Sequence, residues 1–489
     1  MRTYFLQILL LLIFESCGQK AEKKPVVMPD NRNYILKEFI SNASLKNASV
    51  GIKAIDLQTS TTLLNYNSEV SLIPASTQKI LISAASLELL GPDHHFKTSL
   101  EYDGYYGDDG VLHGNLYLRG EGDPAFASPM FEKFYGNVFD RLCEAVVNAG
   151  ITGIDGNVVG DASIFGERRI VGTWVWEDIG NYYGATACGL NIYDNSYKIF
   201  LRSPYKTGSQ TKIIRISPPM PWIEFDNQVV ASNDNRDNAY IYGSFYYDKR
   251  IIRGTIPKGQ TEFVIKGSIP DPAFLAANEM IIRLRKNKIR VNGKPESFYQ
   301  KVTAENRKPL TEILSPPLTD IVNQLNENSV NLYAETLLLY LSVIDRGYVN
   351  LSEGCRTLTD FWEKKGMDVQ GIFLEDASGL SRYNAVSVDK LVFVLDYMKN
   401  KSSFSGNFIN SLPVAGVSGS LKSFGKGTVL ENNFRAKSGY MERVMGYAGY
   451  LTTASGKEIA IAVLVNNFSC TNAEMRKMLE DLMMDIAGI

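Results

Sequence analysis

The sequence predicts a mixed α and β protein, an α/β (α+β) fold class built on an antiparallel sheet. Three observations predict it: strand patterns lie near both ends of the chain, helical patterns lie between them, and a strand-rich block from residue 98 to residue 304 interrupts the helical part. Of the 489 residues, 45% are hydrophobic and 21% are charged, which excludes a wholly disordered chain. Lys and Arg number 51 and Asp and Glu number 53, so the formal net charge is −2 and gives no reason to expect nucleic acid as a partner.

The first 17 residues resemble an export signal. A basic residue precedes an apolar run over 5–14, which is shorter than the roughly 18 residues that span a bilayer. Cys17 follows this run after a small residue, as in bacterial lipoproteins, so we expect lipidation of Cys17 and attachment to a membrane through the lipid. Glu15 departs from the usual pattern, and ordinary signal cleavage is the alternative. Residues 18–35 are then expected to be a solvated tether on the exported, periplasmic side.

Hydrophobic spacing and turn residues place the main elements in order. A hairpin is expected over 49–66 with its turn at Gln58-Thr59-Ser60, followed by a helix that opens at Pro74-Ala75-Ser76 and ends at Gly91-Pro92. Further helices are expected over 318–326, over 330–344 and after Ser387. The chain is expected to close with a hairpin of strands 447–451 and 459–465 and a last helix over 472–487. The block 98–304 is rich in Tyr, Gly, Asn and Asp and predicts short strands and turns.

A Ser-x-x-Lys motif opens the first long helix. Residues three apart share a face of a helix, so the ammonium of Lys79 is expected beside the hydroxyl of Ser76. A serine needs a base to become a nucleophile, and a lysine serves as that base only when its pKa falls toward neutrality. The motif alone is weak, because the chain has five matches, beginning at Ser76, Ser203, Ser209, Ser387 and Ser423. Ser76 is favoured because it opens an apolar helix directly after a hairpin; Ser387 is expected to be a helix N-cap.

Two further motifs follow in order. Ser329-Val330-Asn331 lies 253 residues after Ser76, at the break between two helices, and Lys437-Ser438-Gly439 lies another 108 residues on, before the terminal hairpin. Two similar strings, Lys206-Thr207-Gly208 and Ser405-Gly406-Asn407, are assigned to a loop and a polar turn. Ser-x-x-Lys, Ser-x-Asn and Lys-Thr/Ser-Gly in this order form the motif set of penicillin-binding proteins and serine β-lactamases.

The wide gap between the first two motifs resembles the class C low-molecular-mass penicillin-binding proteins, the D-alanyl-D-alanine carboxypeptidase/endopeptidase family. Other segments that look like this family are Gly160-Asp161-Ala162-Ser163-Ile164-Phe165, Trp174-Val175-Trp176-Glu177-Asp178, Asp376-Ala377-Ser378-Gly379-Leu380-Ser381-Arg382 and Ser411-Leu412-Pro413-Val414-Ala415-Gly416-Val417. The resemblance implies a β-lactamase/transpeptidase-like domain with helices on both sides of its sheet, formed by 36–97 and 305–489. It also implies that 98–304 is inserted as two small, mostly β subdomains.

The same resemblance implies the roles of the motif residues. Ser76 attacks the carbonyl of the D-Ala-D-Ala bond and Lys79 accepts its proton. Ser329 relays a proton to the leaving amine, and Asn331 holds Lys79 and the substrate amide. The resemblance implies that Lys437, Ser438 and Gly439 bind the terminal carboxylate of the substrate. It also implies that the backbone N–H groups of Ser76 and Tyr440 form the oxyanion hole. Lys437 is also expected to lower the pKa of Lys79.

A second set of residues is expected to grip the branched diamino acid of the substrate. These residues are Asp161, Phe165 and Arg382. Their alternative roles are structural: Asp161 would be a carboxylate in a turn, Phe165 a ring in the core and Arg382 a cation on the surface. Ser438 stands where many relatives have Thr, and Tyr440-Met441-Glu442-Arg443 is bulkier and more charged than expected, which leaves the width of the cleft open. No metal or cofactor is implied, and β-lactams are the expected inhibitors.

Two alternatives remain open at this point: a β-lactamase or esterase on the same scaffold, and a non-enzymatic protein that senses or organises the cell wall. The remaining cysteines, Cys143, Cys188, Cys355 and Cys470, are far apart in the sequence and fit no metal pattern. Buried free thiols are the favoured interpretation, although export permits disulfides.

Overall fold

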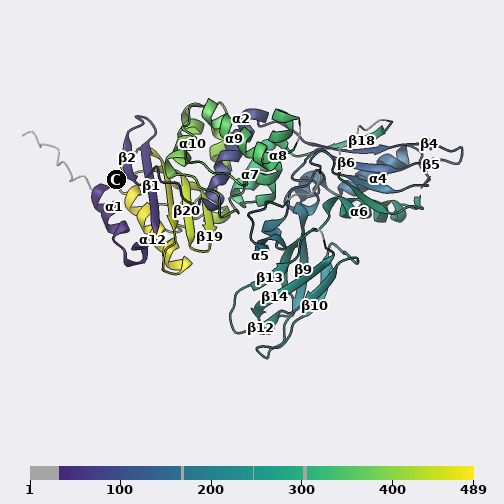
Figure 1. Ribbon diagram of the computed structural model, residues 1–489, viewed down its shortest axis with the longest axis horizontal. Helices are drawn as coiled ribbons and strands as arrows, with labels where there is room; N and C mark the ends of the chain where they lie inside the picture. The colour runs from purple at the N-terminus through teal and green to yellow at the C-terminus, as the bar shows by residue number, and fades with distance from the viewer. Residues whose placement is uncertain (1–31, 167–169, 246, 301–305, 348) are drawn as a thin grey trace, which may run out of the picture.

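The computed structural model describes residues 32–489 apart from 167–169, 246, 301–305 and 348. The molecule is elongated and consists of three parts (Figure 1). One part contains both ends of the described chain, a second lies at the opposite end of the long axis, and a third projects to one side near the middle. The predicted export signal and Cys17 lie outside the described residues.

The first part is built on a five-stranded antiparallel sheet. Its strands, in spatial order, are β19 (Arg435–Met441), β20 (Val444–Thr452), β21 (Glu458–Asn466), β1 (Ser49–Asp56) and β2 (Thr62–Tyr66). The two predicted hairpins are present, and β1 pairs with β21, which joins the N-terminal and C-terminal strands. Strand β19 is an edge strand, so one side of its backbone is left for a ligand.

Both faces of this sheet are buried. Along β21, Ile459, Ile461, Val463 and Val465 belong to one apolar cluster, and the alternate residues Ala460, Ala462 and Leu464 belong to the other. The first cluster packs against α1 (Arg32–Ile40) and α12 (Asn472–Ala487), and the second lies under α10 (Val388–Asn400). A strand buried on both faces reads as a continuous apolar run, which explains the sequence of β21.

A group of helices covers the face on which α10 lies. The group consists of α2 (Lys79–Leu90), α7 (Leu318–Glu327), α8 (Asn331–Arg346), α9 (Leu351–Lys364), α10 and α11 (Ser405–Ser411). Helix α2 is buried on nearly all sides because it packs against the five others. It follows η2 (Ala75–Gln78), a 3₁₀ turn, and ends at Gly91, whose φ of 83° suits glycine. The predictions had not included α1, α9 or α11.

The second part combines two small sheets with helices. The larger sheet has the order β17 (Pro295–Phe298), β8 (Val158–Asp161), β6 (Leu116–Gly120), β3 (Lys97–Tyr102) and β18 (Lys308–Leu314), and the smaller has the order β16 (Arg290–Val291), β7 (Gly153–Ile154), β5 (Val111–His113) and β4 (Tyr105–Tyr106). The helices are α3 (Glu132–Tyr135), α4 (Val138–Asn148) and α6 (Pro272–Lys286). Helices α4 and α6 pack together, which adds helix to a block that was expected to be mostly β.

The third part is made almost entirely of strands. One sheet has the order β10 (Lys212–Ser217), β9 (Ser196–Arg202) and β15 (Phe263–Ser268). The other consists of β11 (Glu224–Asn227), β14 (Lys249–Pro257) and β12 (Val230–Ser232), with β13 (Asn238–Tyr242) also paired to β14. The short helix α5 (Trp176–Ile179) contacts β13 and leads from this part toward the helices of the first part.

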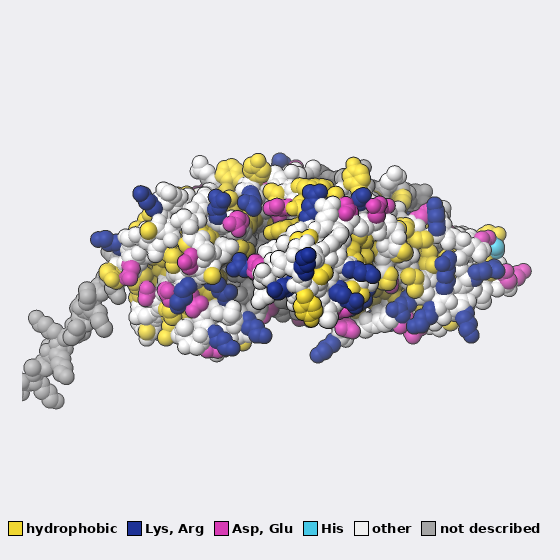
Figure 2. All heavy atoms as spheres, turned by 90° about the horizontal axis from the view of Figure 1, so that it is seen from below, with side chains coloured by type: hydrophobic (Ala, Val, Ile, Leu, Met, Phe, Trp, Pro, Cys, Tyr) yellow, Lys and Arg dark blue, Asp and Glu magenta, His cyan; other side chains and the backbone are white. Residues whose placement is uncertain are grey.

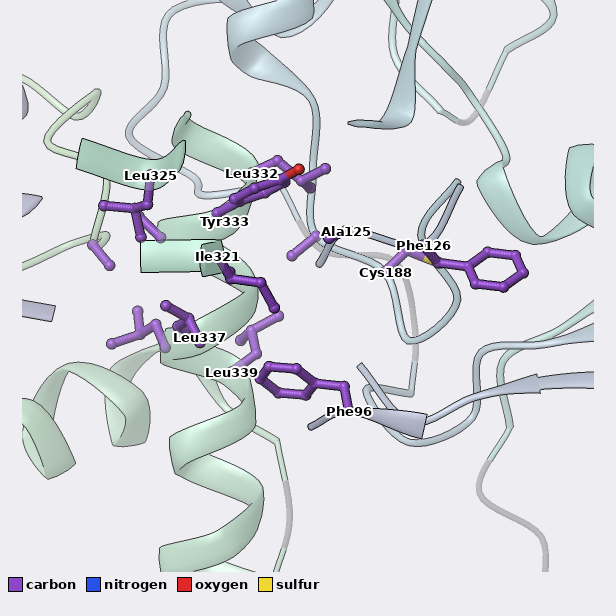
Figure 3. Packing of buried hydrophobic residues seen from close by; sticks show 14 of the residues in the cluster. Phe96, Ala125, Phe126, Cys188, Ile321, Leu325, Leu332, Tyr333, Leu337 and Leu339 are labelled. Carbon is purple, nitrogen blue, oxygen red and sulfur yellow. The ribbon is translucent and has the colours of Figure 1, made fainter. Parts of the chain in front are cut away.

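The apolar core continues from the helices of the first part into the second part. Figure 3 shows Ile321 and Leu325 of α7 and Tyr333, Leu337 and Leu339 of α8. Phe96, Ala125, Phe126 and Cys188 reach the same cluster from segments that border the second part. Burial of such side chains stabilises a fold by roughly 1.5–3 kcal/mol each, so this shared cluster holds the two parts together.

The charge distribution on the surface agrees with the near-neutral composition, and the cysteines lie mostly in the interior. Figure 2 shows acidic and basic side chains interspersed over the face seen from below, as the near-neutral charge implies. Cys143, Cys188 and Cys355 are buried and Cys470 is half-buried. Within the described ranges, every helix is too short or too polar to cross a membrane.

Candidate active site

The nucleophile candidate lies at the joint between η2 and α2. Ala75 adopts a φ of 47°, and Thr77 Oγ1 donates a hydrogen bond to the Pro74 carbonyl at 2.6 Å, which closes the turn that carries Ser76. Lys79 begins α2 one turn later, and its Nζ lies 2.8 Å from Ser76 Oγ. The structure therefore brings the serine and the lysine of the first motif into direct contact.

Lys79 is completely buried, and this burial controls its protonation. Its Nζ donates hydrogen bonds to Asn331 Oδ1 and to the Ser378 carbonyl, both at 2.6 Å. Burial lowers the pKa of Lys79 to about 7, although Asp376 and Glu335 act in the opposite direction. A neutral amine has two N–H groups and one lone pair. Because two acceptors take the N–H groups, the lone pair is left for the Ser76 hydroxyl.

The second and third motifs meet on the other side of Ser76. Ser329 occupies the break between α7 and α8 with a φ of 56°, and its Oγ accepts a hydrogen bond from Lys437 Nζ at 2.9 Å. Lys437 lies on the edge strand β19 and is buried. Burial and the nearby Lys79 hold the pKa of Lys437 well below its usual range. We expected this repulsion to appear as a lowered pKa of Lys79; burial is instead the main cause there.

Edge strand β19 runs very close to the turn that carries the nucleophile. A Cβ atom on Gly439 would lie 2.6 Å from the Pro74 carbonyl oxygen and 2.9 Å from the Thr77 nitrogen, so a side chain at this position would push the strand away. The Ser438 hydroxyl donates to Ser420 Oγ at 2.7 Å, and Tyr440 lines the cleft beside Ser76. The glycine of the third motif is therefore required by packing.

Buried acids support the Lys79 side of the site, and the sequence analysis did not identify them. Glu335 Oε1 accepts hydrogen bonds from the backbone N–H groups of Ala377 at 3.1 Å and Ser378 at 2.7 Å, and Ser378 in turn accepts from Lys79. Asp376 closes the same loop by accepting from the Gly379 and Ser381 N–H groups. The signal for Glu335 was an acidic residue four positions after Asn331, on the buried face of an otherwise apolar helix.

The pKa of Glu335 also departs from its usual range. Burial, together with the charge of Asp376, raises the pKa of this carboxyl to about 8. Glu335, Asp376 and Lys79 therefore lie in one buried cluster, in which the protonation of Glu335 and that of Lys79 affect each other.

The inserted region contributes directly to the site. Asn331 Nδ2 donates a hydrogen bond to the Tyr183 carbonyl at 2.8 Å, and Trp174 Nε1 donates to Asp376 Oδ2 at 2.8 Å. A cleft of about 1120 Å³ is lined by Ser76, Ser329 and Asn331 together with residues of the third part, whereas Lys79, Lys437 and Ser438 are not part of its lining. Its lining beyond the motif residues includes Glu177, Asp178, Tyr182, Tyr183, Tyr193, Asp194, Ser196, Lys198, Ser217, Tyr240, Lys266, Glu279, Arg382, Tyr440 and Glu442.

The predicted substrate-gripping residues are not all in this cleft. Arg382 lines it and lies close enough to Asp178 to lower the pKa of that carboxyl, although burial raises it overall. Asp161 is buried, where it pairs with Arg307 and accepts the Ser163 N–H, and Phe165 is buried beside Gly122. The structure thus brings Arg382 to the motif residues and leaves Asp161 and Phe165 outside the cleft lining.

The discounted motif matches lie apart from the site. Lys206-Thr207-Gly208 forms an exposed turn, and Ser405-Gly406-Asn407 opens α11, a helix where we expected a turn. Ser387 occupies the N-cap position of α10, but its side chain makes no capping hydrogen bond. Within the described part of the chain, the His, Cys, Asp and Glu side chains form no group of three that is suited to a metal ion.

Comparisons with known proteins identify the family of the chain. The model of the D-Ala-D-Ala carboxypeptidase 3 (S13) family matches residues 33–487. The D-alanyl-D-alanine carboxypeptidase DacB of Haemophilus influenzae is 26% identical over 446 residues, which are 88% of either chain. A D-alanyl-D-alanine carboxypeptidase of Actinomadura sp. (strain R39) is 26% identical over 442 residues, which cover 88% of this chain and 80% of the relative.

Solved structures show the same fold. Penicillin binding protein 4 of H. influenzae superposes with a TM-score of 0.80 at 23% identity, over 94% of this chain and 100% of that one. A second structure of that protein, in complex with a β-lactam, superposes with a TM-score of 0.75 at 24% identity, over 93% of this chain and 98% of that one. Because the family model spans nearly all of the described chain, the protein belongs to the D-Ala-D-Ala carboxypeptidase 3 (S13) family of serine peptidases.

Proposed function

We propose that Ser76 is the nucleophile of a peptidase that cuts D-Ala-D-Ala bonds in peptidoglycan stem peptides. The observation that carries this proposal is the position of buried Lys79, 2.8 Å from Ser76 Oγ and with a pKa near 7. At neutral pH about half of the molecules then hold Lys79 in the uncharged form that can accept a proton. Such a base, directly in contact with a serine, is suited to acyl transfer.

The reaction proceeds in two steps. Ser76 Oγ attacks the carbonyl carbon of the penultimate D-Ala, and its proton passes to Lys79 Nζ. The C–N bond breaks, the leaving amine takes a proton through the Ser329 hydroxyl, and the peptide remains attached to Ser76 as an ester. Water then attacks the ester carbonyl, and the serine regains its proton as the peptide leaves with a new carboxylate.

Neighbouring groups bind and orient the substrate. The Lys437 amine, whose pKa burial and Lys79 hold well below its usual range, and the Ser438 hydroxyl lie on an edge strand and supply N–H and O–H donors for the terminal carboxylate of D-Ala. The backbone N–H groups of Ser76 and Tyr440 are assigned to the oxyanion, at about 3 kcal/mol per donor. Arg382 is assigned to a charged group of the diamino acid, because it lies in the same cleft. The same acyl-enzyme mechanism can remove a terminal D-Ala or cleave a cross-link between two stem peptides.

The test uses protein that lacks residues 1–17, together with its Ser76→Ala variant. Both are incubated with a fluorescent penicillin and examined by gel and by intact mass. A stable adduct on the parent alone supports the proposal. Rapid loss of the antibiotic without an adduct would identify a β-lactamase. If the parent forms no adduct and the antibiotic is not consumed, the acyl-enzyme mechanism with penicillins is excluded.

We further propose that the protein is exported and attached to the membrane through a lipid on Cys17. The support is the apolar run and the small residue that precede Cys17 in the sequence. Intact mass of the membrane fraction tests this directly, with Cys17→Ala as the comparison. A mature chain of the same unmodified mass in both proteins would contradict the proposal.

A further inference from the structure

Two lysines of the third part face the cleft as direct cross-strand neighbours. Lys198 on β9 is paired with Lys266 on β15, and on its other side Lys198 is paired with Ser217 on β10. Directly opposed residues of antiparallel strands project from the same face of a sheet. All three side chains line the cleft that contains Ser76. The sheet thus presents a row of one hydroxyl and two ammonium groups to this cavity.

This row has no evident structural purpose. Like charges placed directly opposite each other destabilise a sheet. Neither lysine forms an ion pair with a described carboxylate, and both side chains are exposed to the cleft. Lys266 Nζ contacts the ring of Tyr182 at 5.4 Å, which orients the ammonium without neutralising it. An arrangement that costs stability without a direct ion pair to offset it is expected where a ligand supplies the opposite charge.

Two acidic side chains of the same cleft, Asp194 and Glu279, are themselves perturbed by burial. Asp194 accepts a hydrogen bond from the Tyr333 hydroxyl at 3.0 Å, and burial raises the pKa of its carboxyl. Burial likewise raises the pKa of Glu279. Lys266 acts against this shift in the pKa of Asp194, so Asp194 balances part of the charge of Lys266, while the strand pairing still places the two ammonium groups side by side.

The row is continuous with the reaction centre. One cleft of about 1120 Å³ is lined by Ser76 and Ser329 and also by Lys198 and Lys266. A single D-Ala-D-Ala unit fills only part of such a volume, so the remaining length suits the peptide beyond the bond that is cut. That peptide carries further carboxylates, which are the anionic groups of the proposed substrate.

We propose that Ser217, Lys198 and Lys266 form an anion subsite that binds a carboxylate of the substrate away from the cleaved bond. The proposal rests on the proposed peptidase function and extends it to a second point of attachment. The lysines supply charge and the serine supplies a hydroxyl donor. The carboxylate comes either from the stem peptide that is cut or from the neighbouring peptide to which it is cross-linked.

The test measures binding without turnover. In a Ser76→Ala background, the Lys198→Gln/Lys266→Gln variant is titrated with a stem peptide that ends in D-Ala-D-Ala and carries one internal carboxylate. The same titration uses the peptide with that carboxylate converted to an amide, and a cross-linked pair of peptides. Lys212→Gln is the matched control, because Lys212 is an exposed lysine on β10 that does not line the cleft.

We expect the double variant to bind the carboxylate peptide about tenfold more weakly, since two partly exposed charge contacts are lost together. Binding of the amide peptide and the behaviour of Lys212→Gln should stay unchanged. A loss seen only with the cross-linked pair places the carboxylate on the neighbouring peptide. Equal binding by parent and double variant, or equal losses for carboxylate and amide peptides, would overturn the proposal.

Two further readouts separate the possible failures. Thermal melting should show the double variant to be as stable as the parent or more stable, because a like-charge pair has been removed; a large drop would indicate a structural role and count against the subsite. Acylation of the parent by penicillin tests the peptidase function by itself. An acylated parent with unaltered peptide binding in the double variant refutes the subsite alone.

Discussion

The uncharged fraction of Lys79 should set the rate at which Ser76 is acylated. A lysine with its ordinary pKa of 10.5 would be uncharged in roughly 1 molecule in 3000 at pH 7. With the pKa lowered to about 7, the uncharged fraction at pH 7 becomes about one half. Burial of this side chain therefore raises the population that can react by a factor of about 1500.

The sign of the pH dependence follows from this shift. Below pH 7 Lys79 gains a proton and loses the lone pair that accepts the Ser76 proton. At pH 5 only about 1 molecule in 100 keeps the uncharged amine, so acylation should be about fiftyfold slower than at pH 7. Above pH 8 the rate should level off, until Tyr or Cys ionisation or unfolding intervenes.

The assay follows covalent labelling by a fluorescent penicillin at several pH values, under conditions where the protein stays folded. Lys79→Arg should abolish labelling, because a guanidinium cannot lose its proton in this range. Lys97→Arg is the control, since Lys97 is half exposed and pairs with Glu312 on the surface. A rate that is flat between pH 5 and pH 8, or that rises only above pH 9, would refute the assignment of Lys79 as the base.

Three further changes test other parts of the site. Glu335→Gln should leave the midpoint of the acylation profile near pH 7, because a pKa of about 8 keeps this carboxyl mostly uncharged at that pH; a midpoint lowered by about one unit would show that Glu335 is charged in the resting protein. Gly379→Ala should slow acylation more than tenfold, because the new Cβ would lie 2.0 Å from the Ala75 carbonyl oxygen. The φ of +79° at this position also costs about 1–2 kcal/mol for residues other than glycine. Acylation kinetics, measured beside a melting curve, check this prediction, and labelling at the parent rate would contradict it. Ser438→Ala should lower kcat/KM for D-Ala release by about tenfold, and Ser438→Thr, which keeps a hydroxyl, should retain the parent value. Equal kcat/KM values for the two variants would exclude the hydroxyl as a donor to the substrate carboxylate.

Local patterns were sufficient for most of the first part. The hairpin 49–66, the helix that ends at Gly91, the terminal hairpin and the helix 472–487 all appear in the structure near their predicted bounds. Each has a strong period and clear turn or capping residues. Helices α9 and α11 were missed. Helix α11 has only seven residues and gives a weak periodic signal, whereas α9 has a regular helical period that the sequence analysis overlooked.

The inserted block was harder to interpret. Its tyrosines, glycines and asparagines predicted strands, and most of its elements are strands. Helices α4 and α6 lie among them, with nine buried positions in α6. Part of their buried faces packs on strands that are distant in sequence, β8 for α6 and β18 for α4, and a single sequence does not reveal that packing.

The sequence by itself determined the family, the antiparallel sheet of the first part and the three motifs of the candidate site, because each motif and strand pattern depends on residue types at short spacings, and the order and separation of the motifs are read directly from the chain. Tertiary structure alone decided how Ser76, Asn331 and Lys437 meet, since hundreds of residues separate them along the chain. It also decided the pKa of Lys79, which depends on complete burial, and the position of Asp161, which an ion pair with Arg307 holds away from the cleft. Burial, long-range contacts and cleft shape are properties of packed surfaces, and no local pattern in a chain encodes them.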